Sequence, residues 1–65
     1  MTQSLEFILD NWETFDTYIH RDMSDEQIKE TVKHVLLNNN FSIDDILLTI
    51  NDYRVIMLFK TQGRH

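Results

Sequence analysis

The fold of this chain is decided first by residues 23–28, MSDEQI, which carry the pattern of a helix start. The Ser24 hydroxyl can accept the backbone N–H of Gln27, and the Gln27 side chain can reach back to the backbone N–H of Ser24, which together make a capping box. Met23 and Ile28 stand at the two positions whose side chains pack together across such a cap. The stretch therefore predicts a helix that begins near residue 24.

The sequence on the C-terminal side of this start predicts one helix end and a second helix start. Residues 38–40 are three asparagines, whose side chains compete for backbone hydrogen bonds and tolerate the left-handed conformation, so the helix is expected to end there. Residues 41–46, FSIDDI, repeat the start pattern with Ser42 as the cap. We expect one helix over 42–60. In the alternative, the helix stops at residues 51–52 and residues 53–60 form an extended strand.

The N-terminal segment predicts a further helix over residues 3–20. Its apolar residues recur at steps of three and four, which places them on one helical face: Leu5, Ile8, Trp12, Phe15 and Ile19. The chain contains no proline and one glycine, which favours long helices over an all-β fold with many tight turns. We therefore expect a single all-α domain over residues 1–65, with three helices near 3–20, 24–38 and 42–60.

The size of the chain indicates that this domain needs additional stabilisation. A protein of 65 residues buries only about 60% of the surface of its unfolded chain, and this one has no cysteine for a disulfide. Self-association is the remaining means of stabilisation. The three predicted helices supply more apolar residues than one small core needs: Leu5, Ile8, Leu9, Trp12, Phe15, Ile19, Ile28, Val32, Val35, Leu36, Ile46, Leu47, Ile50, Tyr53 and Met57. The remaining apolar residues Val55, Ile56, Leu58 and Phe59 are predicted to form a homodimer interface.

The charge distribution points to a candidate binding surface. The net charge is −5, and residues 1–30 carry eight acidic side chains against two basic ones. Four of the acidic residues follow one another at steps of four and three: Glu6, Asp10, Glu13 and Asp16. Like charges at this spacing repel one another along a helix, and a basic protein surface would relieve that repulsion. The stripe is either a solvated helix face or the site where a basic partner, such as a nucleic-acid-binding protein, docks.

The sequence offers little for catalysis. The histidines are His20, His34 and His65, and no two of them stand at a spacing typical of a metal site. Ser24 and Ser42 are explained by helix capping, and no glycine-rich phosphate-binding loop is present. We expect no metal, no cofactor and no enzymatic activity, and a protein of the adaptor or inhibitor type.

DNA binding is the alternative function, because helices near 24–38 and 42–60 have the proportions of a helix-turn-helix. The start of the second of these helices argues against DNA binding. It would place Asp44 and Asp45 at the positions where a recognition helix contacts base edges and phosphates. The basic residues of the C-terminal segment are sparse: Arg54, Lys60, Arg64 and His65.

The N-terminus has no basic segment typical of a signal peptide, and the longest apolar run covers only residues 55–59, so we expect a cytoplasmic protein without a membrane span.

Overall fold

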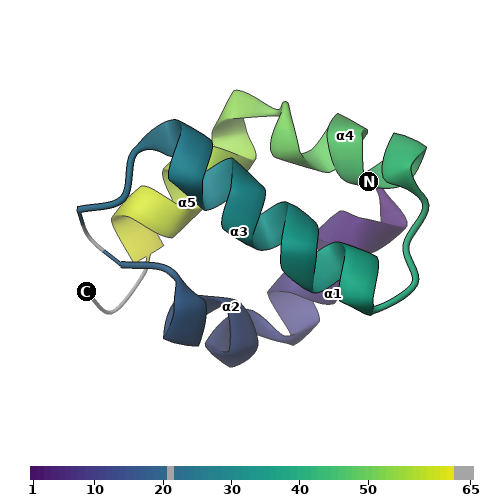
Figure 1. Cartoon of the computed structure of the whole chain (residues 1–65), viewed down its shortest axis with the longest axis horizontal. Helices are drawn as coiled ribbons and strands as arrows, with labels where there is room; N and C mark the ends of the chain where they lie inside the picture. Colours follow the sequence, from purple (N-terminus) through teal and green to yellow (C-terminus); the bar gives the residue numbers. More distant parts are fainter. Residues whose placement is uncertain (21, 63–65) are drawn as a thin grey trace.

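The computed structural model describes residues 1–20 and 22–62, which form an all-helical fold (Figure 1). The expected all-α class is confirmed, but the described residues form five helices and not three. The helices are α1 (Gln3–Asp10), α2 (Trp12–Tyr18), α3 (Asp25–Asn38), α4 (Ile43–Ile50) and α5 (Tyr53–Gln62). Two of the three predicted helices are each divided by a short break.

Helix α3 begins and ends as its sequence predicts. Ser24 accepts the backbone N–H of Gln27, and the Gln27 side chain accepts the backbone N–H of Ser24 at 2.8 Å, which confirms the capping box. At the other end Asn40 adopts a left-handed φ of 68°. The N–H groups of Asn40 and Phe41 donate to the carbonyls of Leu37 and Leu36, the bonding pattern of a Schellman motif. The asparagine run therefore ends the helix through backbone geometry.

The predicted helix over residues 3–20 is broken at Asn11, where φ is −127° and ψ is 37°. The Asn11 side chain donates to the Phe7 carbonyl at 2.9 Å, and the Asn11 backbone N–H donates to the same carbonyl. An asparagine that bonds back to the preceding turn competes with continuation of the helix. The chain therefore ends α1 at Asp10 and starts α2 at Trp12.

The predicted helix over residues 42–60 is broken at Asn51 and Asp52. The Asp52 carboxylate accepts the backbone N–H of Arg54 at 2.9 Å, and the Asp52 carbonyl accepts the N–H of Val55, which starts α5. The strand alternative placed the break correctly. It was wrong about the segment after the break, because residues 53–62 are helical and not an extended strand.

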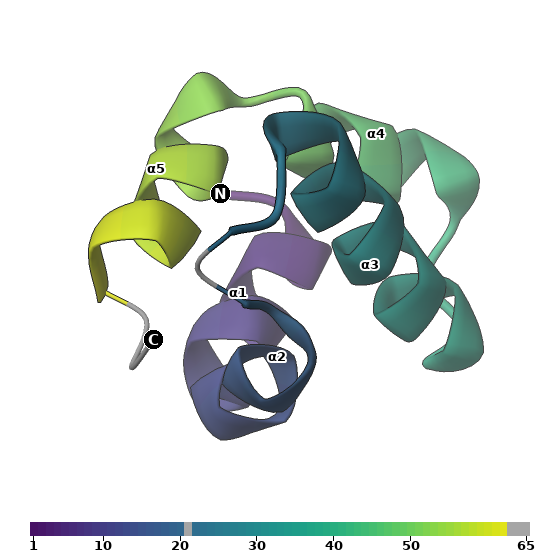
Figure 2. The same ribbon diagram turned by 60° about the vertical axis from the view of Figure 1, so that its left-hand side comes forward.

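The core draws on all five helices, and α5 closes one side of the bundle next to α4 and the start of α3 (Figure 2). Its buried apolar residues are Ile8, Phe15, Ile19, Ile28, Val32, Leu36, Ile46, Ile50, Val55, Ile56 and Phe59. A continuous helix after Ile50 would have buried Tyr53 and Met57. Because α5 starts a new helix, its buried positions change, and Tyr53 is exposed.

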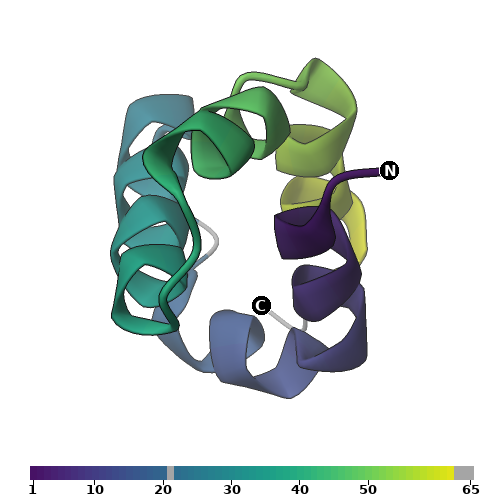
Figure 3. The ribbon, with the colours of Figure 1, turned by 90° about the vertical axis from the view of Figure 1, so that its right-hand side faces the viewer.

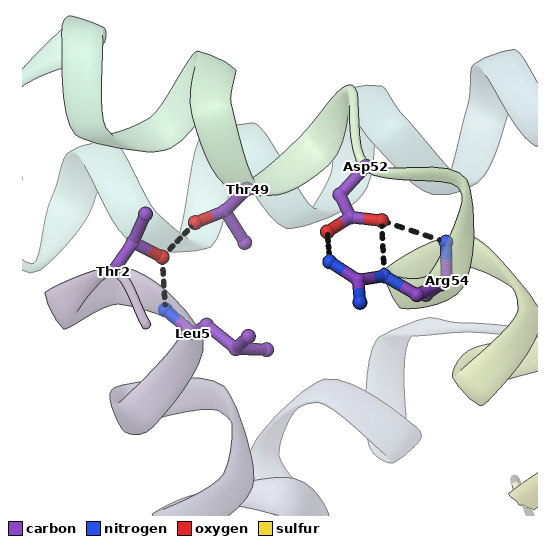
Figure 4. Close-up of polar contacts among 5 residues, drawn as sticks. All are labelled: Thr2, Leu5, Thr49, Asp52 and Arg54. Carbon is purple, nitrogen blue, oxygen red and sulfur yellow. Dashed lines mark hydrogen bonds and ion pairs between the residues drawn. The ribbon is translucent and has the colours of Figure 1, made fainter.

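A polar cluster joins the N-terminus to α4 in the interior. Ser4 and Thr49 are buried, and their hydroxyl oxygens lie 2.6 Å apart. The Thr2 hydroxyl accepts the backbone N–H of Leu5 at 3.1 Å and also contacts the Thr49 hydroxyl (Figure 4). The Asp45 carboxylate accepts the N–H of Ser4 at 2.9 Å, so α4 supplies part of the cap of α1. No buried side-chain polar atom of the described residues lacks a hydrogen-bond partner.

Candidate functional site

The structure distributes the four predicted acidic residues over two helices. Glu6 and Asp10 lie on α1, and Glu13 and Asp16 lie on α2. Glu6, Asp10 and Glu13 are exposed, whereas Asp16 is half-buried. The break at Asn11 thus replaces the predicted continuous stripe by two short acidic helix faces that follow one another.

An exposed leucine lies among these acidic residues. The Leu9 side chain is 47% exposed, although its place in the apolar pattern predicted a core position. On the same helix, Glu6 stands three residues before Leu9 and Asp10 follows it, whereas Glu13 lies on α2, after the break at Asn11. Glu6, Leu9, Asp10 and Glu13 are called the acidic face below.

The predicted dimer residues lie mainly in the core. Val55, Ile56 and Phe59 are buried, and Leu58 is half-buried. The Phe59 ring stacks on the Trp12 ring with centroids 4.8 Å apart and an interplanar angle of 10°. These residues are not an exposed surplus, because the break at residues 51–52 turns them toward the other helices. The expected exposure on which the predicted interface rested is therefore wrong for Val55, Ile56 and Phe59.

The exposed apolar residues gather on α4 instead. Ile43 and Leu47 are exposed, and Leu48 is 69% exposed, while Ile46 and Ile50 on the other side of the helix are buried. Together with Asp44, the three exposed residues are called the α4 face below. A shallow hollow on this side is lined by Asp44, Leu47, Leu48, Asn51 and Asp52. The sequence pattern did not reveal this surface because it assigned Leu47 to the core.

A second surface hollow, of about 500 Å³, lies between α2 and α3. The residues that line it are Thr14, Tyr18, Thr31, His34, Val35, Asn38 and Asn39. Two of these side chains already bond to their own helix, Thr31 to the Gln27 carbonyl and Asn39 to the Val35 carbonyl. The sequence could not indicate this hollow, because it arises only where two segments pack together.

The C-terminal basic residues are partly engaged within the chain. The Arg54 guanidinium donates two hydrogen bonds to the Asp52 carboxylate, at 3.1 and 2.8 Å (Figure 4). This hydrogen-bonded pair lowers the pKa of Asp52 and raises the pKa of Arg54. Lys60 forms an ion pair with Asp25 at the start of α3. Arg64 and His65 lie outside the described residues.

The histidines of the described residues lie at the surface. His20 and His34 are exposed, and His65 lies outside the described residues. Within residues 1–20 and 22–62, no three His, Asp or Glu side chains come together as metal ligands would. Ser24 and Ser42 both act as helix caps. In the same part of the chain, no helix has the length and apolar composition needed to cross a membrane.

Comparisons with known proteins gave no match: no protein-family model, no curated protein and no solved structure matches the chain.

Proposed function

We propose that this chain is a small non-enzymatic interaction protein that binds a basic surface of another protein through its acidic face. The observation that carries the proposal is the exposure of Leu9, at 47%, on a helix that also exposes Glu6 and Asp10 and is followed by α2 with the exposed Glu13. An exposed leucine loses its contact with water only when a partner covers it, and about 25 cal/mol is gained for each Å² of apolar surface so buried.

The chemistry of the acidic face defines the partner. Carboxylates around a central leucine suit a surface on which lysine or arginine side chains surround a small apolar depression. Complementary charge at the rim raises the association rate, and the apolar centre slows dissociation. Proteins that bind nucleic acid carry basic surfaces of this kind, and a protein that covered one would act as an inhibitor or adaptor. The proposal involves no metal, cofactor or chemical step.

The composition of α4 argues against the DNA-binding alternative. Helices α3 and α4 follow each other with a short turn, as in a helix-turn-helix. However, the exposed residues of α4 are Ile43, Asp44, Leu47 and Leu48, and the helix contains neither lysine nor arginine. Affinity for DNA phosphates requires several such cations on one face.

The homodimer and the cytoplasmic location remain part of the proposal. Self-association would stabilise a domain of this size, because so short a chain buries a small core. Since Val55, Ile56 and Phe59 are buried, an interface between two copies must use other residues.

The proposal is tested by comparative capture from extracts of the source cell. Three baits are used: the wild-type chain, the Asp10→Lys/Glu13→Lys variant, and a control with the same net charge, Asp22→Lys/Glu30→Lys, whose changes lie outside the acidic face. We expect a basic protein that the wild type and the control retain, that the first variant loses, and that salt releases. Equal retention by all three baits would overturn the proposal.

A further inference from the structure

Polar contacts hold the start of α1 to α4. The Asp45 carboxylate accepts the backbone N–H groups of Gln3 and Ser4, and the buried hydroxyls of Ser4 and Thr49 lie 2.6 Å apart. The Thr2 hydroxyl also contacts the Thr49 hydroxyl. Thr2, Ser4, Asp45 and Thr49 are called the polar cluster below. The cluster joins two helices that lie far apart in the sequence.

The other end of α1 is a break in the backbone. Asn11 leaves the helical conformation, with φ at −127° and ψ at 37°, and α2 starts at the next residue. In Figure 3, α1 (purple) begins below α4 (green) and ends next to α2. The helix is therefore attached at one end by the polar cluster and at the other by a single non-helical residue. Residues between two elements are the positions that absorb a change of direction.

The apolar attachment of α1 between these ends is small. The buried residues of α1 are Ser4 and Ile8, so one of the two is apolar, whereas all three buried residues of α3 are apolar. Leu5 and Phe7 pack against the core but are only partly buried. Segments with few buried apolar contacts open at a lower free energy than the whole molecule unfolds.

We propose that α1 detaches from α4 about Asn11 when the polar cluster opens, while the other helices stay packed. A free helix of eight residues is not stable in water, so α1 loses its helical hydrogen bonds once it has left α4. Opening divides the acidic face, because its three residues on α1 move and Glu13 on α2 stays. The polar cluster thus controls whether the acidic face is assembled, and this consequence rests on the proposed function.

Native-state hydrogen exchange of the free wild-type chain tests the inference. We expect the backbone amides of α1 to have protection factors at least about tenfold lower than those of Val32 and Leu36, which lie in the core on α3. Equal opening free energies for the two helices would overturn the proposal, because α1 would then open only when the whole chain unfolds.

Two variants separate the polar cluster from general stability. Thr49→Val removes the hydroxyl that contacts Ser4 and Thr2, and it leaves the surface unchanged because Thr49 is buried on the side of α4 away from the α4 face. Ser24→Ala weakens the cap of α3 instead. We expect Thr49→Val to speed exchange in α1 about fivefold. Ser24→Ala should speed exchange in the core of α3 and leave α1 unchanged.

The conservative variant Thr49→Ser keeps the hydroxyl, so its α1 amides should exchange more slowly than those of Thr49→Val. Exchange in α1 that Thr49→Val leaves unchanged would overturn the role of the polar cluster. Exchange in α1 that Ser24→Ala and Thr49→Val raise alike would show that α1 opens only with the whole fold. Because the free chain is measured, none of these outcomes depends on the acidic-face proposal, which capture tests separately.

Discussion

The carboxylate of Asp45 accepts the backbone N–H of Ser4 at 2.9 Å and that of Gln3 at 3.2 Å, across 41 and 42 positions of the sequence. The first N–H groups of a helix have no partner within the helix, and a carboxylate placed there also interacts favourably with the helix dipole. Asp45 belongs to α4, so the first helix of the chain is capped by the fourth. This relationship makes the N-terminal segment dependent on the tertiary fold.

Replacing Asp45 should therefore destabilise the whole fold. Asp45→Ala leaves the N–H groups of Gln3 and Ser4 without their acceptor, so we expect the Tm to fall by several degrees in a thermal melt followed by circular dichroism. The matched control is Asp44→Ala, which removes an exposed carboxylate from the same helix turn. Equal melting of the two variants would show that the cap of α1 contributes nothing to stability.

The same carboxylate should make the fold sensitive to acid. Its hydrogen bonds with Ser4 lower the pKa of Asp45 below the ordinary value of 3.8. Between the two pKa values the unfolded chain binds more protons than the folded one, so stability is present above pH 3.8 and is lost as the pH falls through the folded pKa.

The measurement is urea denaturation at a series of acidic pH values, on the wild type and on Asp45→Asn. The wild type should lose stability more steeply below pH 3.8 than the variant, which has no proton to bind at this position. Parallel curves for the two proteins would contradict the prediction. Asp52, whose pKa is also lowered, contributes the same pH dependence of stability to the wild type and to the variant.

The serine caps provide a third prediction. Ser24→Ala and Ser42→Ala each remove the hydroxyl that accepts an N–H in the first helical turn, at 3.2 Å in both helices. Each change should cost about 1 kcal/mol of unfolding free energy, measured by chemical denaturation. Thr17→Ala is a useful control, since that hydroxyl bonds within an established helix. If neither cap variant differs from the wild type, the caps do not stabilise these helices.

Because Asn40 has a left-handed backbone, glycine and alanine at this position should affect stability differently. Glycine adopts a φ near 68° without steric cost, so Asn40→Gly should leave stability unchanged or slightly higher. Asn40→Ala should lower it by about 1 kcal/mol, because alanine is disfavoured in this region. The comparison uses equilibrium unfolding of both variants, and an alanine variant as stable as the glycine one would contradict it.

The local parts of the fold could be predicted from the sequence, and the parts set by tertiary contacts could not. The start and end of α3 follow from residues 23–28 and from the asparagines, because both depend on neighbours in the sequence. Asp45 shows the limit. Its position after Ser42 is that of a capping-box residue for α4, yet its side chain caps α1. No local sequence pattern indicates which helix the Asp45 side chain caps.

The break at residues 51–52 explains the errors in the predicted surface of α5. Asn11 and Asp52 were available in the sequence as residues that favour helix ends, but the apolar periodicity on either side favoured continuous helices. A break changes which side of the following helix faces the core. For this reason Val55, Ile56 and Phe59 are buried, whereas Tyr53 is exposed. The acidic residues were found from composition and spacing alone, but the exposure of Leu9 among them was not.

The most direct test of the acidic face is calorimetric titration of the captured basic protein with the wild type, Leu9→Ala and Asp10→Lys/Glu13→Lys. Melting curves first establish that all three are folded. We expect the charge variant to bind at least about tenfold more weakly, the Leu9 variant to lose affinity at both low and high salt, and the wild-type affinity to fall as salt is raised. Affinities that are the same for all three proteins and independent of salt would contradict the proposed function.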